Sequence, residues 1–211
     1  MHAVPPIRRA RAAVLVAVAV VVLSLVAGAS PASAAWTWPW PTPTPTPTLG
    51  RDVVVFDIDG TLTTDEGSNA VQPNAVAAVK AFVAKGYSVV YVTARWKALQ
   101  ESSTRSWLSS NGFPDRPLYM SSSLLLDDAS KARFKTTTLA TIEQGTPEVV
   151  GAYGDSSSDF TAYANAGVPQ ARVFALKRAS AATCQSGTYA ACLTNGYTSH
   201  LSFIQALPAG Q

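Results

Sequence analysis

Histidine and charged residues are scarce in this sequence. Of its 211 residues only 14% are Asp, Glu, Lys or Arg, and the two histidines are His2 and His200. His2 lies in a segment that we interpret below as a leader, so a metal site or phosphatase centre that needs several histidines is excluded. A Ser-His-Asp triad that uses His200 is not excluded. Catalysis by this chain must otherwise rely on carboxylates, hydroxyls and lysine.

An excess of basic residues is also missing once the N-terminus is set aside. The formal net charge of +3 comes from Arg8, Arg9 and Arg11, and the remaining 13 basic residues balance 13 acidic ones. A neutral body offers no electrostatic footprint for nucleic acid and no polybasic patch for anionic lipid. We therefore expect no nucleic-acid partner. The length accommodates one domain of ordinary size, with a real core, plus additional sequence.

Residues 1–34 have the three parts of a secretory signal peptide. The basic residues are followed by an uncharged apolar stretch, residues 12–29, and then by the small residues Ala32-Ser33-Ala34. This order predicts cleavage after Ala34 and a secreted, extracytoplasmic protein. An uncleaved membrane anchor remains an alternative, because the apolar stretch approaches the ~20 residues that span a bilayer.

Residues 35–50 form a linker rich in Trp, Pro and Thr. Alternating Pro and Thr cannot form a helix or a central strand, and the run PTPTPTPT predicts a stiff polyproline II spacer of roughly 25 Å. Trp36, Trp38 and Trp40 precede it. These aromatic residues could contact a membrane interface or a glycan, or they could be incidental. The folded domain is predicted to span residues 51–207.

Short apolar strands alternate with amphipathic helices through this domain. The predicted strands are residues 53–56, 88–93, 117–120, 149–153 and 172–176, and the predicted helices are residues 73–85, 96–110, 127–144 and 157–166. Such alternation is typical of a parallel sheet with crossover helices. The sequence therefore predicts an α/β fold with a parallel five-stranded sheet and helices on both faces.

Cysteine is limited to Cys184 and Cys192, within the segment CQSGTYAAC. In an exported protein, a pair this close predicts a disulfide that closes a short loop. A metal pair or a catalytic thiol is disfavoured because no histidine or third cysteine is near in sequence.

Four groups of polar residues follow predicted strands or lie on a predicted helix. They are Asp57, Asp59 and Gly60; Thr93 and Arg95; Lys131, Arg133 and Lys135; and Asp155 with Asp159. Ligands of open parallel sheets bind at the carboxyl ends of the strands, beside the point where the strand order reverses. Each group alone could be only a turn or a helix cap, but together they indicate one site.

These residue types suit the hydrolysis of a phosphate monoester. Mg²⁺ neutralises a phosphate dianion and prefers carboxylate oxygens, which Asp57 and Asp155 can provide. Asp57 can also act as the nucleophile and form an aspartyl-phosphate, while Asp59 protonates the leaving oxygen and later takes a proton from water. The Thr93 hydroxyl and the Gly60 amide can bind phosphoryl oxygens. One lysine is needed to stabilise the transferring group, and the chemistry alone does not choose between Lys131 and Lys135.

The segments FDIDGTLT, YVTAR, FKTTTLATI and GDSSSD resemble the four motifs of the haloacid-dehalogenase (HAD) superfamily of phosphotransferases. More narrowly, YVTAR and AYGDSSSDFTAYANAGVPQARVFALK are similar to the lipin-type domain of lipin phosphatidate phosphatases and membrane-associated phosphatidylinositol-transfer proteins. The resemblance covers residues 51–177 and implies a Rossmann-like HAD fold. It also implies residue roles. The catalytic residues are Asp57 and Asp59, the phosphate-binding residues are Gly60, Thr93, Arg95 and Lys135 (in preference to Lys131), and the Mg²⁺-binding residues are Asp57, Asp59, Asp155 and Asp159.

The segments between the motifs are too short to hold a sizeable cap domain, so the site is predicted to be open. An open site suits a bulky or surface-bound phosphoester. We therefore expect an exported, Mg²⁺-dependent phosphomonoester hydrolase, for which the resemblance implies phosphatidate or another phospholipid and allows peripheral contact with a membrane. The sequence lacks the separate N-terminal domain and amphipathic helix of lipins.

Two alternatives use the same fold without catalysis. One is a phospholipid-binding module, since the transfer-protein relatives bind lipid and lack part of the first acidic motif. The other is a surface interaction protein whose site is a relic. The presence of both Asp57 and Asp59 favours the enzyme.

Overall fold

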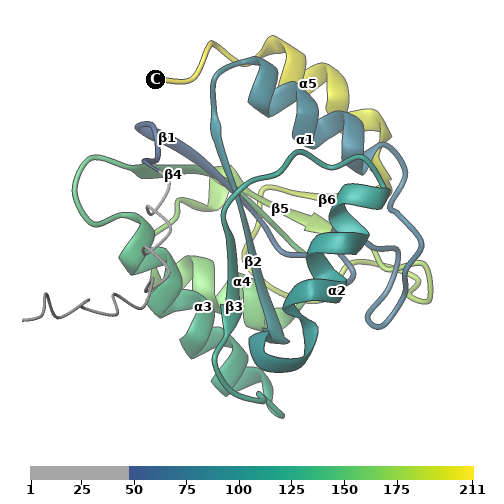
Figure 1. Cartoon of the computed structure of the whole chain (residues 1–211). Helices are drawn as coiled ribbons and strands as arrows, with labels where there is room; N and C mark the ends of the chain where they lie inside the picture. Colours follow the sequence, from purple (N-terminus) through teal and green to yellow (C-terminus); the bar gives the residue numbers. More distant parts are fainter. Residues whose placement is uncertain (1–47) are drawn as a thin grey trace, which may run out of the picture. The chain divides into compact units, whose positions relative to one another are not determined.

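The computed structural model describes residues 48–211 (Figure 1). The predicted signal peptide, the alternative anchor and most of the Trp-rich linker lie outside the described residues.

A parallel sheet of six strands runs through the centre of the domain (Figure 1). Its strand order is β3-β2-β1-β4-β5-β6, and every neighbouring pair is parallel. The strands are β1 (Asp52–Phe56), β2 (Ser88–Trp96), β3 (Leu118–Ser121), β4 (Glu148–Gly154), β5 (Val173–Leu176) and β6 (Ala191–Tyr197). The order reverses between β1 and β4, and in sheets of this kind ligands bind outside the carboxyl ends of the strands at that point.

The prediction of a parallel α/β sheet is confirmed, but the predicted number of five strands is wrong. The sixth strand, β6, is an edge strand of sequence ACLTNGY whose residues are partly exposed. It escaped prediction because Asn-Gly is typical of a turn and because an edge strand needs no continuous apolar run. The short helix that follows it, α5 (Leu201–Ala206), was not predicted either.

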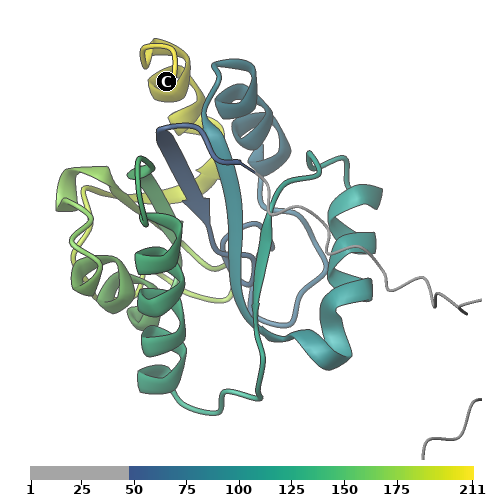
Figure 2. The ribbon, with the colours of Figure 1, turned by 60° about the vertical axis from the view of Figure 1, so that its left-hand side comes forward.

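Helices cover both faces of the sheet (Figure 2). One face carries α1 (Ala75–Ala84), α2 (Lys97–Ser110) and α5, whereas the other carries α3 (Asp128–Ile142) and α4 (Ser157–Asn165). Two short 3₁₀ helices, Gln170–Arg172 and Thr198–His200, precede β5 and α5. The four predicted helices therefore form within a few residues of their expected bounds.

Alternation along the strands builds two separate cores. Val54 and Phe56 of β1 point toward α1 and α5, while Val53 and Val55 point toward α3 and α4. Successive side chains of a strand face opposite sides of the sheet, so an unbroken apolar run is the sequence expected for a strand buried on both faces.

His200 belongs to an aromatic cluster in the first of these cores. Its Nε2 atom lies 2.9 Å from the hydroxyl of Tyr153, and its ring stacks on Phe203 with centroids 4.6 Å apart. Tyr153 in turn stacks on Phe56 and Phe174. The hydrogen-bond partner of His200 is thus a tyrosine rather than a serine or an aspartate, and the structure gives no support to a triad.

No sizeable cap domain interrupts the described part of the chain, as predicted. Residues 57–74, between β1 and α1, form a loop whose two arms meet at one antiparallel bridge, between Thr63 and Val71. Residues 122–127 connect β3 to α3 without regular structure. Within residues 48–211, none of the helices is long and apolar enough to cross a bilayer.

The predicted disulfide between Cys184 and Cys192 is present. Cys192 is the second residue of β6, and Cys184 lies in the connection from β5. The bond therefore fastens this irregular connection to the edge strand.

The last residues of the chain lie beside the beginning of β1. The Asp52 amide donates to the carbonyl of Gln211 at 3.0 Å, and the Gln211 amide donates to the Asp52 carboxylate at 3.0 Å. The Gly210 amide donates to the carbonyl of Lys85 at 2.8 Å. These contacts lie at the edge where β1 begins, which is opposite to the carboxyl ends of the strands.

Acid should destabilise the domain through His200. Burial lowers the pKa of His200 to about 4, below its usual value of 6.5. The unfolded chain therefore takes up a proton before the folded chain does, so stability falls as pH decreases from about 6.5 to about 4. The loss from this residue is at most about 3 kcal/mol. Urea unfolding of wild type and His200→Gln across this range measures it: the difference in unfolding free energy should shrink as pH falls, and a constant difference would contradict the assignment.

Candidate active site

Three carboxylates meet where the strand order reverses. Asp57 directly follows β1, Asp155 directly follows the neighbouring strand β4, and Asp159 lies in the first turn of α4. One oxygen from each lies within 4.8 Å of the others, and all three residues are buried. Asp159 is fixed by a capping box with Ser156, whose hydroxyl and amide both donate to its carboxylate. The structure thus brings these three predicted acids together, and their roles remain predictions.

Two glycines make room for this cluster. Gly60 has φ +72°, and a Cβ atom there would lie 2.1 Å from Oδ2 of Asp155. A Cβ atom on Gly154 would lie 2.5 Å from the Cβ of Asp159. The Gly60 amide, which we predict to bind phosphate, donates to the hydroxyl of Thr63 at 2.9 Å. Both glycines are therefore required by close packing around the carboxylates, and Gly60 is required by its positive φ as well.

Lys135 provides the buried positive charge of the site. Its Nζ atom, carried by α3, donates to Asp57 at 2.6 Å and to Asp159. Burial opposes the charged form of Lys135, but the two carboxylates outweigh it and raise its pKa. Lys131, one turn earlier, lies 3.6 Å from Glu66 and 3.8 Å from Asp128. Of the two lysines left open by the chemistry, Lys135 is therefore the one within the acidic cluster, as the resemblance implies.

The electrostatics of the cluster suit a divalent cation. Burial is the main cause that raises the pKa of Asp57 well above its usual value, and burial together with the charge of Asp159 raises the pKa of Asp155 to about 7. The pKa of Asp159 is lowered, because Lys135 and Ser156 outweigh its burial. The ammonium of Lys135 does not by itself neutralise three carboxylates. Their oxygen atoms are the type of ligand that Mg²⁺ prefers. The residues present fit that ion.

Asp59 lies outside the cluster and is held by Arg95. The guanidinium donates from Nε to Oδ2 of Asp59 at 2.9 Å and from Nη2 to Oδ1 at 2.7 Å. It also donates to Thr104 of α2 at 3.1 Å, and the Thr93 hydroxyl lies 3.4 Å from Asp59. The structure therefore brings Asp59, Thr93 and Arg95 together as one network. The predicted phosphate-binding roles of Thr93 and Arg95, and the predicted metal-binding role of Asp59, remain predictions.

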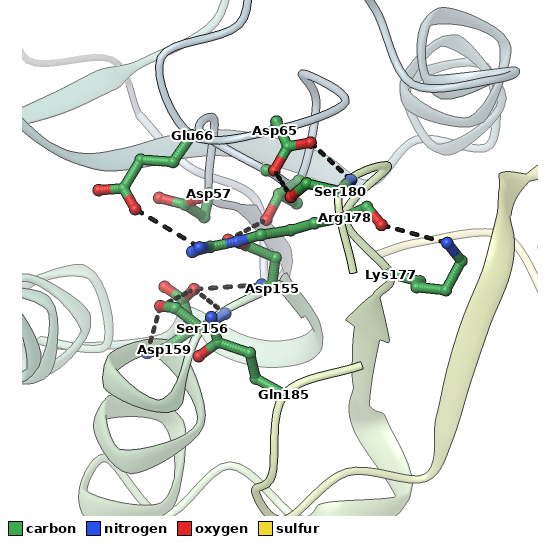
Figure 3. Close-up of polar contacts among 12 residues, drawn as sticks. Asp57, Asp65, Glu66, Asp155, Ser156, Asp159, Lys177, Arg178, Ser180 and Gln185 are labelled. Atoms are coloured by element: carbon green, nitrogen blue, oxygen red, sulfur yellow. Dashed lines mark hydrogen bonds and ion pairs between the residues drawn. The ribbon is translucent and has the colours of Figure 1, made fainter. Parts of the chain in front are cut away.

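Arg178 is a site residue that the sequence analysis missed. It follows β5, and its Nε atom donates to Asp155 while Nη1 lies 3.5 Å from Glu66 (Figure 3). The criterion that selected the other residues, a polar side chain just after a strand, would have selected Arg178 as well. Gln185 also approaches the site, since its side chain accepts a hydrogen bond from the Ser157 amide at 3.2 Å.

A cavity of about 610 Å³ opens above these residues. Its polar lining includes Asp57, Asp59, Asp155, Arg95, Lys135 and Arg178. Its apolar lining includes Trp96, Trp107, Leu124 and Leu125. The apolar side chains of the lining come from the end of β2, from α2 and from the loop after β3.

The domain has a HAD-like fold. A protein from Mesorhizobium loti assigned to the HAD-like phosphatases has a similar fold, with a TM-score of 0.51 and 15% sequence identity over 78% of this chain and 90% of that one. Residues 54–177 match the family described as PITM 1-3, LNS2 domain, and the chain belongs to this family.

Relatives in this family are much longer proteins. Mouse membrane-associated phosphatidylinositol transfer protein 3 is 30% identical over 161 residues, which are 74% of this chain and 16% of the mouse protein. Rat membrane-associated phosphatidylinositol transfer protein 1 is 32% identical over 165 residues, which are 74% of this chain and 12% of the rat protein. The chain therefore spans a small part of the relatives that it matches.

Removing the buried ammonium should destabilise the domain in a way that a divalent cation repairs. Lys135→Met leaves the buried carboxylates of Asp57 and Asp159 without their cation, and we expect a loss of about 3–5 kcal/mol in EDTA. Lys131→Met, on the same helix with exposed partners, should cost less than about 1 kcal/mol. Urea unfolding with EDTA and with Mg²⁺ compares the two. Equal stability of the two variants in EDTA, or no recovery of Lys135→Met in Mg²⁺, would contradict this account of the cluster.

Proposed function

We propose that the domain is an exported, Mg²⁺-dependent phosphomonoester hydrolase that acts through an aspartyl-phosphate, on phosphatidate or another bulky phosphoester. The observation that carries this proposal is the position of Asp57. Its carboxylate lies at the carboxyl end of β1, in contact with Lys135 and in a cluster with Asp155 and Asp159. A nucleophile beside a fixed cation and oxygen donors for Mg²⁺ is the arrangement that phosphoryl transfer requires.

The proposed reaction has two steps, which are formation and hydrolysis of the aspartyl-phosphate. An oxygen of Asp57 bonds to phosphorus while the bond from phosphorus to the ester oxygen breaks, and Asp59 gives its proton to that leaving oxygen. Asp59 then takes a proton from water, whose oxygen attacks the phosphorus and releases phosphate and free Asp57. Lys135 offsets the charge on the transferring group, and Arg95 orients Asp59. Mg²⁺, held by Asp57, Asp155 and Asp159, would neutralise the phosphate dianion.

An apolar rim supports a lipid or another large substrate. Leu124 lines the cavity and is 60% exposed, and Leu126, two residues further along the same loop after β3, is 83% exposed. Leu99, in the first turn of α2, is 73% exposed but does not line the cavity. The Trp96 indole joins the two segments through a 3.2 Å hydrogen bond to the Ser122 carbonyl. Large exposed leucines beside a polar cavity suit contact with acyl chains at a membrane surface.

Export is supported by the leader pattern of residues 1–34 and by the disulfide. Disulfides form and persist in oxidising compartments outside the cytoplasm. We therefore place the hydrolase at the outer side of the cytoplasmic membrane or beyond it, where a phospholipid surface is available.

Substitution of Asp59 tests the proposed function most directly. An acid that protonates the leaving group contributes to turnover but not to binding of the phosphate dianion, so Asp59→Asn should lower kcat by ~10²–10⁴-fold and leave binding intact. The loss should be largest for an alkyl ester such as phosphatidate and smaller for nitrophenyl phosphate, whose leaving group needs little protonation. Phosphate release and ligand affinity are measured for both esters, with Mg²⁺ and with EDTA.

Asp57→Asn is the matched control, because it is nearly isosteric and should abolish turnover of both esters. A wild-type protein that releases no phosphate from either ester in Mg²⁺, yet binds phosphatidate vesicles as Asp59→Asn does, would establish the phospholipid-binding module instead of the hydrolase.

The apolar rim predicts a difference between soluble and membrane-bound substrate. Leu124→Ser combined with Leu126→Ser removes two exposed leucines. Transfer of both side chains from water into a membrane is favourable by a few kcal/mol. We expect at least about a tenfold loss of turnover on phosphatidate vesicles and no change on nitrophenyl phosphate. Phe203→Ser, which removes a partly exposed apolar side chain on α5, is the control; because Phe203 also stacks on His200, thermal unfolding checks that this variant is folded. An equal loss on both substrates would mean that the loop supports the site itself rather than contact with lipid.

A further inference from the structure

Arg178 supplies the positive charge next to Asp155. Lys135 donates to Asp57 and Asp159, whereas the side-chain oxygens of Asp155 accept from the Thr61 hydroxyl at 3.3 Å and from Nε of Arg178. The Arg178 side chain is 19% exposed, and that of Asp155 is 1% exposed. The contact is thus a largely buried ion pair between a residue after β5 and a residue after β4.

A divalent cation and Arg178 need the same carboxylate. The oxygens of Asp57, Asp155 and Asp159 lie within 4.8 Å of one another, so a cation held by all three sits close to the guanidinium. A cation and a guanidinium that contact the same carboxylate repel each other strongly in a buried site. Binding of the cation and pairing of Arg178 with Asp155 therefore oppose each other.

The backbone around Arg178 is fixed, but its side chain has a second partner. The Ser180 amide and hydroxyl donate to Asp65 at 2.8 and 2.6 Å, and the Ala179 amide donates to the Thr64 carbonyl at 2.8 Å. These contacts hold the loop against the segment that follows β1 (Figure 3). Glu66, which is 60% exposed and 3.5 Å from Nη1, lines the same cavity as Arg178.

We propose that Arg178 and a divalent cation compete for Asp155, and that a bound cation releases the guanidinium toward Glu66 and an anionic group of the substrate in the cavity. The identity of that group rests on the proposed function, whereas the competition does not. Arg178 would then bind the substrate only when the cation needed for the reaction is present. It is a substrate-binding residue whose availability depends on the metal.

Titration calorimetry with Mg²⁺ tests the competition without any turnover. Arg178→Gln removes the competing charge and should bind Mg²⁺ about tenfold more tightly than wild type. Arg172→Gln is the matched control, because Arg172 pairs with Glu148 at the opposite edge of the sheet and its loss should not change Mg²⁺ affinity. Unchanged or weaker Mg²⁺ binding by Arg178→Gln would overturn the proposal.

The same variants are then titrated with inorganic phosphate at saturating Mg²⁺. Here Arg178→Gln should bind about tenfold more weakly, because the released guanidinium is missing. The two effects have opposite signs, whereas a residue that only supports the fold would weaken both ligands. Unchanged phosphate affinity would overturn the substrate-binding part of the proposal.

Circular dichroism and thermal unfolding in EDTA establish whether Arg178→Gln is folded. Should it not fold, Arg178→Lys takes its place, because it keeps the charge without the Nε donor. This variant should bind Mg²⁺ more tightly and phosphate more weakly than wild type, by smaller factors. If neither affinity changes in this way, the proposal is overturned. Neither titration requires hydrolysis. A protein without turnover would therefore contradict the proposed function while leaving the competition at Asp155 confirmed or refuted on its own measurements.

Discussion

The confinement of three carboxylates in a buried cluster is the constraint to which the surrounding structure responds. Asp57, Asp155 and Asp159 would repel one another and lose hydration if nothing compensated them. Lys135 compensates two of them, and Arg178 the third. The fold thus concentrates buried charge in one cluster, where three carboxylates face two cationic side chains. Binding of a divalent cation would offset the remaining negative charge.

Packing and hydrogen bonding around the cluster follow from the same constraint. The capping box at the start of α4 holds Asp159 in place through its own helix, and Gly154 lets that side chain approach the strand. Gly60 lets the loop after β1 close over Asp155. Residues that look like ordinary turn and cap signals in the sequence are therefore needed to bring acids from two strands and a helix together.

Much of this arrangement could be predicted from the sequence because it depends on local patterns. The apolar runs of β1 and β4 predict buried parallel strands, and residues just after such strands must share one edge of the sheet. The edge strand β6 could not be predicted, since its pairing with β5 depends on tertiary contacts rather than on its own residues. The contacts within the site could not be predicted either. The positions of Asp59 and Arg95 after neighbouring strands place them in one region, but they do not predict the hydrogen bond between them.

The meeting of Gln211 with the start of β1 has a practical consequence for attachment of the domain. The start of β1 and Gln211 both lie at the edge of the sheet opposite to the cavity. Domains whose ends are adjacent tolerate insertion and circular permutation well. A tether, an affinity tag or a solid support joined at either end therefore leaves the mouth of the cavity free to face a surface on the other side.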